Sequence, residues 1–169
     1  MKLDQINQLT DSGFIELLGG IYEHSPWVAE SVAGQRPFAS FAELASAMKE
    51  SVEMADKSTR VQLLKAHPEF AGKAAIQGEL TEASTREQGS LSLNNLPSEQ
   101  HKKMLQFNRS FMNKFGFPGI VAVRMQSSVD GIFSLFEQRL ENTLEQEISA
   151  AIEQVHLIAK CRLQDLVDE

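Results

Sequence analysis

The chain is poor in several residues on which whole classes of protein depend. Among its 169 residues there is one cysteine, Cys161, so no disulfide can form within the chain, which is typical of a reducing cytoplasm. Its 16 Lys and Arg are outnumbered by 23 Asp and Glu, giving a formal net charge of -7. A nucleic-acid partner needs a basic surface, so we expect none. No apolar run is long enough to cross a membrane, so we expect no membrane partner either.

The two ends of the chain carry no recognisable address. The first residues, Met1 to Gln5, lack the apolar core of a signal peptide. The last three residues, Val167 to Glu169, do not match the peroxisomal signal. We therefore expect a cytoplasmic protein.

Metal-binding motifs are also missing. The four histidines, at positions 24, 67, 101 and 156, have no second histidine or cysteine at the spacing of metal ligands, and no His-Glu-x-x-His occurs. We expect no metal site from these spacings. A helical hydrolase whose metal ligands come from distant parts of the chain remains an alternative hypothesis.

What the chain does contain is helix-forming sequence. Glycine and proline number only 10 and 5, and hydrophobic and charged residues make up 42% and 23%, as in an ordinary globular protein. A chain of this length buries about two-thirds of the surface that it exposes when unfolded, so it needs no disulfide or structural metal to be stable. We predict an all-α protein with a single domain spanning residues 1–169.

Polar N-caps and Gly or Pro stops divide the chain into helices. Ser40 with Glu43 forms a capping box, and Pro68 forces His67 out of helical conformation. The predicted helices are Ser40–Ala55, Ser58–Ala66, Ser98–Lys114, Ser128 or Asp130 to Glu141, and Leu144–Val167. Residues 76–97 are predicted to be a loop with one short helix, Ser84–Gln88. Ile120–Val123 is predicted to be an extended or helical segment packed in the core, since a lone strand would have no partner.

Two ionisable residues each have structural and functional interpretations. Arg162 lies on an apolar stripe of the last predicted helix, completed by Ile148, Ile152, Val155, Ala159 and Leu166. A guanidinium there either reaches outward, pairs with a structural carboxylate or binds a substrate oxygen. His67 stands at a helix C-terminus. It is either a surface or capping residue, which the helix dipole favours there, or a residue that donates and accepts protons.

Two further segments have both structural and functional interpretations. Ser84 with Glu87 fits a capping box, so Ser84 is expected to cap the helix. The functional alternative is that this helix start presents N–H groups, Glu87 and Gln88 to an anionic or urea-like ligand. Residues 117–121 either pack in the core or line a pocket with their backbone, where Gly119 allows a close approach.

Several blocks together resemble the 2-oxo-4-hydroxy-4-carboxy-5-ureidoimidazoline (OHCU) decarboxylase family of urate degradation. They are Leu63–Lys73, Ser84–Gln88, Phe107–Phe111 and Lys114–Pro118, with Glu23–Val28 near the start and Ile158–Leu163 near the end. The resemblance extends over nearly the whole chain. It implies a compact, single-domain helical bundle, a homodimer, and a cofactor-free carboxy-lyase that converts OHCU to (S)-allantoin and CO₂.

The resemblance also implies roles for individual residues. It makes His67 and Glu87 catalytic. The substrate-binding positions that it implies are Pro68, Ser84, Thr85, Arg86, Gln88, Gly119, Ile120, Val121, Ala122, Val123 and Arg162. The family usually has a large residue, often phenylalanine, at the position of Gly119. A helical adaptor that binds a partner protein, without catalytic activity, is the alternative from another functional class.

Overall fold

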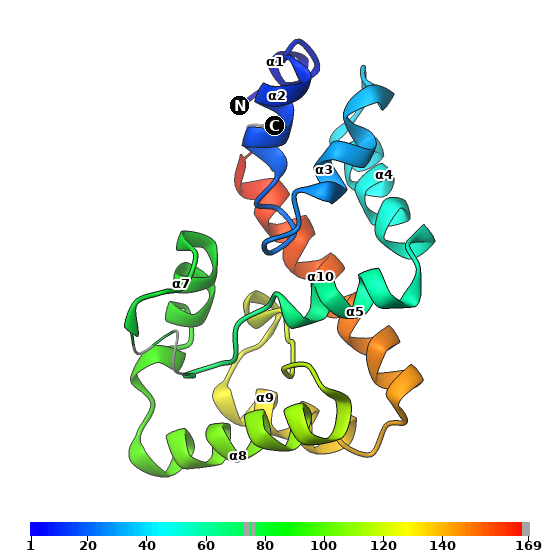
Figure 1. Cartoon of the computed structure of the whole chain (residues 1–169). Coiled ribbons are helices and arrows are strands. Elements are labelled where there is room, and N and C mark those ends of the chain that lie inside the picture. The colour runs from blue at the N-terminus through cyan, green and yellow to red at the C-terminus, as the bar shows by residue number, and fades with distance from the viewer. Residues whose placement is uncertain (73–74, 76, 167–169) are drawn as a thin grey trace. The chain divides into compact units, whose positions relative to one another are not determined.

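The computed structural model describes residues 1–72, 75 and 77–166 (Figure 1). Within these residues the regular structure is entirely helical, with no strand, and the predicted all-α class is confirmed. The chain divides into two compact units. The first comprises Met1–Ala66 and the chain from His156 onward, and the second comprises His67–Val155.

The first unit contains the N-terminal helices. They are α1 (Leu3–Asn7), α2 (Asp11–Leu18), α3 (Trp27–Val32), the 3₁₀ helix η1 (Ala33–Gln35), α4 (Phe41–Met54) and α5 (Lys57–Lys65). Helix α3 packs against α2 and α4. The N-terminal ammonium donates to the Leu166 carbonyl at 2.8 Å, near the end of the last helix, where the helix dipole favours a cation.

Helix caps in this unit confirm one prediction and correct another. The Glu43 N–H donates to the Ser40 hydroxyl at 3.1 Å, so Ser40 is the N-cap as predicted. The Glu43 carboxylate accepts from the Ala39 N–H, one residue before the Ser40 N–H that a capping box uses. The predicted cap at Ser58 is wrong. Asp56 caps α5 instead, accepting from the Thr59 N–H at 2.7 Å, because its carboxylate stands three residues before that amide.

The second unit contains the remaining helices. They are α7 (Glu82–Gly89), η2 (Leu93–Asn95), α8 (Ser98–Phe115), η3 (Val123–Met125) and α9 (Val129–Arg139). Helix α10 (Leu144–Leu166) begins in this unit and ends in the first. Residues 77–97 are therefore more helical than predicted, with both α7 and η2. The prediction for residue 76 lies outside the described residues.

Two helix ends in the second unit follow from local sequence. Gly116 ends α8 with φ 78, a left-handed conformation that favours glycine. Ser128, rather than Asp130, caps α9 by accepting from the Gly131 N–H at 3.1 Å. Helix α9 ends at Arg139, two residues before the predicted end. For α10 the predicted start at Leu144 is confirmed, while Val167 lies outside the described residues.

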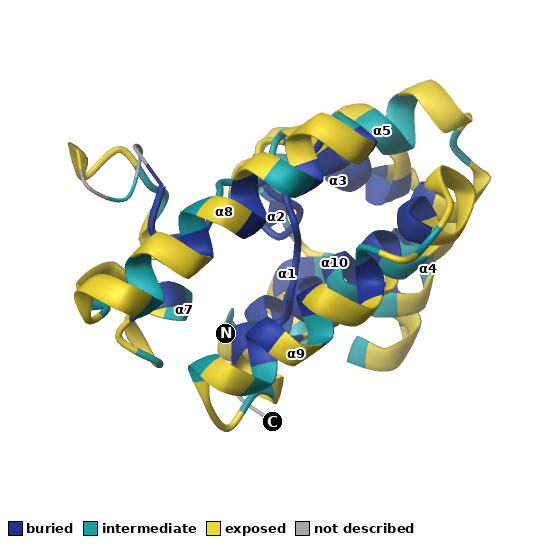
Figure 2. Ribbon diagram, turned by 90° about the horizontal axis from the view of Figure 1, so that it is seen from below, coloured by how far each residue is buried: buried dark blue, intermediate teal, exposed yellow. Residues whose placement is uncertain are grey.

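A cluster of phenylalanine rings forms the core of the second unit. Phe136 of α9 lies at its centre, with ring centroids 4.9 Å from Phe111, 5.6 Å from Phe107 and 6.1 Å from Phe70. Helix α8 alternates between buried and exposed residues along its length, because one face meets this cluster (Figure 2). Since Phe70 follows His67 closely in sequence, the cluster fixes the segment that carries the histidine.

Candidate functional site

His67 begins a turn that leaves helix α5. The turn comprises residues 67–72, and we call it the His67 turn. Because the residue before a proline avoids helical conformation, α5 ends at Lys65 with Ala66 as its C-cap. The His67 side chain is 7% exposed. The imidazole is therefore largely shielded from water, which strengthens its interaction with a bound polar ligand.

Helix α7 contacts the His67 turn through Gln88. The Gln88 side-chain oxygen accepts from the Ala71 N–H at 3.2 Å, and its amide nitrogen lies 3.4 Å from the Glu69 carbonyl. Gln88 is 2% exposed. One predicted substrate-binding residue is thus brought into contact with the turn that carries the predicted catalytic histidine.

The remaining predicted residues of α7 divide between two faces. Ser84 is buried, four residues before Gln88 and therefore on the same face, while Glu87 is half-buried. Thr85 and Arg86 are exposed, so the structure does not bring their side chains to this buried face. The predicted cap at Ser84 is wrong as well. Thr81 caps α7 by accepting from the Ser84 N–H at 3.2 Å, which places Ser84 inside the first turn.

Residues 119–123 form a buried segment, which we call the wall segment. Ile120, Val121, Ala122 and Val123 are each at most 4% exposed, and none lies in a strand. This confirms the predicted core packing. Val123 begins η3, which contacts α7. The second unit therefore places the end of the wall segment beside the helix that carries Ser84, Glu87 and Gln88.

The backbone of the wall segment is held by side chains from two other helices. The Ala122 N–H donates to the Gln154 side-chain oxygen at 3.0 Å. The Ile120 carbonyl accepts from Arg139 at 2.5 Å. Arg139 also pairs with Glu147 at 2.5 Å, and these two side chains are 6% and 0% exposed. Since a sheet does not hold this segment, these contacts supply the partners that its polar backbone groups need.

Gly119 lies against the phenylalanine cluster. A Cβ atom at this position would lie 2.9 Å from two ring carbons of Phe136 and 3.1 Å from the Phe111 ring. Both rings are fully buried. The volume beside Gly119 is therefore already filled by aromatic side chains, which leaves no room for a larger residue without a shift of these rings.

Arg162 belongs to the first unit and pairs with a buried carboxylate. Its Nη1 lies 2.6 Å from Oε2 of Glu23, and the two side chains are 6% and 2% exposed. Nη1 also donates to the Gly20 carbonyl at 3.3 Å. The predicted burial of the stripe on α10 is confirmed, except that Leu166 is half-buried. Pairing with a structural carboxylate, one of the alternatives for Arg162, is therefore present.

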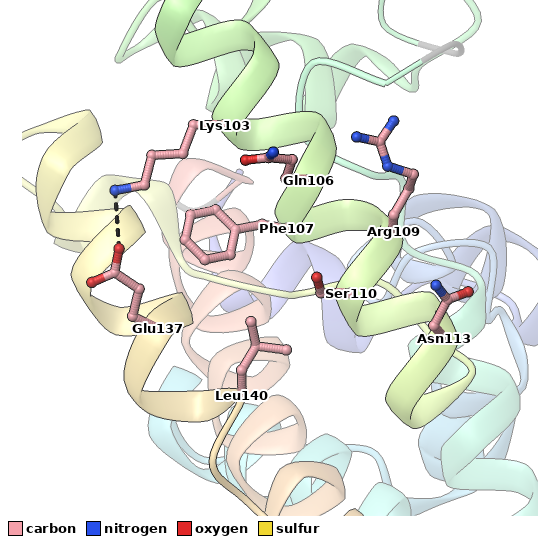
Figure 3. Close-up of a pocket in the computed structure, with 8 residues that line it drawn as sticks. All are labelled: Lys103, Gln106, Phe107, Arg109, Ser110, Asn113, Glu137 and Leu140. Atoms are coloured by element: carbon pink, nitrogen blue, oxygen red, sulfur yellow. Dashed lines mark ion pairs between the residues drawn. The ribbon is translucent and has the colours of Figure 1, made fainter.

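A surface groove lies elsewhere in the second unit, between α8 and α9 (Figure 3). It has a volume of about 560 Å³ and is lined by Lys103, Gln106, Phe107, Arg109, Ser110, Asn113, Glu137 and Leu140. Lys103 pairs with Glu137 across it at 2.9 Å. None of the predicted site residues lines this groove.

The described residues form neither a metal-binding cluster nor a membrane-spanning helix. In those parts of the chain no three His, Cys, Asp or Glu side chains are grouped so that they could hold a metal ion. No helix formed by the described residues is both long and apolar enough to span a membrane.

Comparison with known proteins identifies the family. The family model described as OHCU decarboxylase matches residues 7–164 of this chain. The chain belongs to the OHCU decarboxylase family. A curated family member from Haloferax volcanii, named 2-oxo-4-hydroxy-4-carboxy-5-ureidoimidazoline decarboxylase, is 39% identical over 165 residues, which cover 98% of this chain and 95% of that protein.

Two further matches are to longer proteins. A "uric acid degradation bifunctional protein" from Bacillus sp. (strain TB-90) is 36% identical, and the match covers all of this chain and 33% of that protein. The solved structure of (S)-allantoin synthase matches with a TM-score of 0.79 and 28% identity, covering 99% of this chain and 55% of that one. The OHCU decarboxylase fold thus occurs both as a separate chain and within longer ones.

Several residues that contact the His67 turn, the wall segment or Arg162 could not be assigned a role from the sequence. Glu23, which pairs with Arg162, and Asn108, which donates to the Phe70 carbonyl, stand in blocks that resemble the family, whereas Arg139, Glu147 and Gln154 do not. A charged residue such as Glu23 beside apolar positions is a signal for a buried ion pair, but its partner is far away in the chain. The contacts of Gln154 and Arg139 with the wall segment have no local sequence signal.

Proposed function

We propose that this chain catalyses the cofactor-free decarboxylation of OHCU to (S)-allantoin and CO₂, the third step from urate to allantoin. This proposal rests on the family match over residues 7–164, and the relative of 39% identity and nearly equal length supports it. The buried His67 turn and its contact with α7 are consistent with this activity. The relatives give no support to the alternative of a protein-binding adaptor.

Decarboxylation leaves an electron pair that needs an acceptor. When the bond to the carboxylate carbon breaks and CO₂ leaves, the pair enters the conjugated C=N of the substrate's own ring, so no cofactor is required as an electron sink. A proton must then be delivered to one face of the product carbon to give a single enantiomer. The protein has to hold the carboxylate out of the ring plane, stabilise the developing charge and supply that proton.

The proposed roles follow the family positions. His67 supplies the acid–base function, and Glu87 orients the imidazole or the substrate hydroxyl. Ser84, Thr85, Arg86 and Gln88 on α7, Pro68 in the His67 turn, the wall segment and Arg162 form the substrate-binding set. For Thr85 and Arg86, whose side chains are exposed, binding through the backbone fits better than binding through the side chain. For Arg162, the Glu23 carboxylate fixes the position of the guanidinium, which is proposed to donate to a substrate oxygen.

A coupled assay tests the proposed reaction. Urate oxidase and 5-hydroxyisourate hydrolase generate OHCU from urate, and circular dichroism follows the chirality of allantoin. We expect rapid growth of an (S)-allantoin signal that EDTA does not reduce. Optically silent decay of OHCU at its spontaneous rate, in the presence of folded protein, would refute the proposal. Loss of activity with EDTA would favour the metal-dependent hydrolase instead.

The His67→Asn variant tests the proposed acid–base residue. Losing a positioned acid–base group typically lowers the rate by about 10²- to 10⁴-fold. We expect this loss in stereospecific turnover with an unchanged far-UV spectrum. His101→Asn, on α8, serves as the matched control and is expected to retain full activity. Near-full turnover by His67→Asn would remove His67 from the mechanism.

We also propose that the chain is a cytoplasmic homodimer and that residues 1–169 form one domain. Light scattering coupled to size exclusion tests the dimer. For the domain, the single Trp27 reports unfolding of the first unit, whereas far-UV circular dichroism reports both units. Coincident transitions by the two probes are expected for one cooperative domain, and separated transitions would indicate two.

A further inference from the structure

The His67 turn has a backbone that needs external support. Pro68 has no N–H to donate. Ala71 has φ 49, a left-handed conformation that residues other than glycine rarely adopt. Such a conformation persists only where surrounding contacts determine it. The position of His67 therefore depends on the groups that hold residues 69–71.

Two amide side chains supply this support from two different helices. Gln88 of α7 contacts the Ala71 N–H and the Glu69 carbonyl, as described above. Asn108 of α8 donates from Nδ2 to the Phe70 carbonyl at 2.9 Å, across 38 residues of sequence. Asn108 is 3% exposed, so water cannot readily replace this donor if it is removed.

We infer that Asn108 is a positioning residue for the proposed acid–base residue His67, acting through the Phe70 carbonyl. This inference rests on the proposed decarboxylase function. Asn108 bonds to Phe70, which lies three residues after His67, so its role is to fix the turn rather than to take part in proton transfer. Phe70 is also anchored by its ring against Phe136, so the Asn108 contact sets the orientation of a peptide group that packing already keeps nearby.

The inference predicts a specific kinetic pattern. If the turn shifts, the imidazole is misplaced for proton transfer, while α7 and the wall segment still bind the substrate. An interaction needed only in the transition state lowers kcat without raising KM. A displacement of about 1 Å can cost about 10²-fold in rate. A purely structural role for Asn108 would instead lower stability and leave kcat per folded molecule unchanged.

The test compares Asn108→Asp with Asn113→Asp. Aspartate has the shape of asparagine, but its carboxylate can only accept, so it repels the Phe70 carbonyl. Asn113 is exposed on the same helix, so Asn113→Asp introduces the same change of charge away from the turn. For each variant, kcat and KM for OHCU are measured by the coupled assay at a temperature where far-UV circular dichroism shows the native spectrum. If Asn108→Asp does not fold, Asn108→Ser replaces it.

We expect kcat of the Asn108 variant to fall by roughly 10- to 100-fold, with KM changed by less than about 3-fold, while Asn113→Asp matches the wild type. An unchanged kcat in folded protein would overturn the inference, and so would an effect confined to KM. The wild type is assayed first. If it does not produce (S)-allantoin, the proposed function fails; if it does and Asn108→Asp has full kcat, only the positioning role fails.

Discussion

The buried Arg139–Glu147 pair allows a quantitative prediction about stability. Glu147 is completely buried and accepts from Arg139 Nε at 3.3 Å, from Arg139 Nη2 at 2.5 Å and from Asn142 at 2.9 Å. Glu147→Gln removes the negative charge and turns one acceptor into an N–H donor facing other donors. The guanidinium cannot lose its proton, so it remains as a buried charge without a counter-ion. Breaking a buried pair in this way costs about 3–5 kcal/mol.

Urea unfolding followed by far-UV circular dichroism measures this loss. With a slope of about 2 kcal/mol per molar urea, a loss of about 3 kcal/mol lowers the unfolding midpoint by about 1.5 M. Glu153→Gln is the matched control, because Glu153 is exposed on the same helix. That change is expected to alter the free energy of unfolding by less than about 0.5 kcal/mol.

A double variant tests whether the isolated buried charge causes the loss of stability. Arg139→Met with Glu147→Leu replaces both charges by apolar side chains of similar volume, which is often far less costly than removing one partner. We expect the double variant to be more stable than Glu147→Gln, with a residual loss of about 1–3 kcal/mol because the Ile120 carbonyl loses its donor. If Glu147→Gln loses less than about 1 kcal/mol, or if the effects of the two single changes simply add, an isolated buried charge is not the cause.

Two further predictions concern other parts of the chain. Gly119→Ala is expected to lower the free energy of unfolding by about 1–3 kcal/mol, because the added Cβ would press on the Phe136 ring. Gly34→Ala is the control, since no atom lies within 4 Å of a Cβ at that position. Equal thermal midpoints for the two variants would contradict this prediction. Burial, followed by the Glu53 carboxylate, raises the pKa of the Tyr22 phenol. Stability from Tyr22 is therefore present below pH about 10, the unfolded value, and is lost as pH rises above it. Tyr22 is the single tyrosine, so tyrosinate absorbance should appear together with unfolding, and a native far-UV spectrum with full tyrosinate absorbance near pH 10 would contradict this.

Local sequence was sufficient for most of the helices and insufficient for some caps. Gly116 and Pro68 end helices because their backbone preferences act without any distant partner. Ser58 and Ser84 were predicted to be caps, but Asp56 and Thr81 precede them with side chains equally able to accept from an amide. Where two eligible caps stand close together, a sequence pattern alone does not select between them.

The residues proposed for the site come from family positions, whereas the contacts that support them could not be predicted. His67, Ser84 and Gln88 stand in recognisable blocks, and the structure buries all three. The partners that support the site come from distant parts of the chain. Asn108 reaches Phe70 over 38 residues, and Gln154 reaches Ala122 over 32. Such pairings depend on how the helices pack, which no local pattern encodes.

The chemistry of the groups that hold the His67 turn has a consequence for how the protein responds to acidity. Gln88 and Asn108 support the turn with carboxamides, which neither gain nor lose a proton in water at any pH that the fold survives. An imidazole in either place would change its bonding across the range where histidine titrates. With neutral amides, the support stays the same whether His67 is protonated or not. The two supporting side chains therefore add no titrating group of their own to the turn.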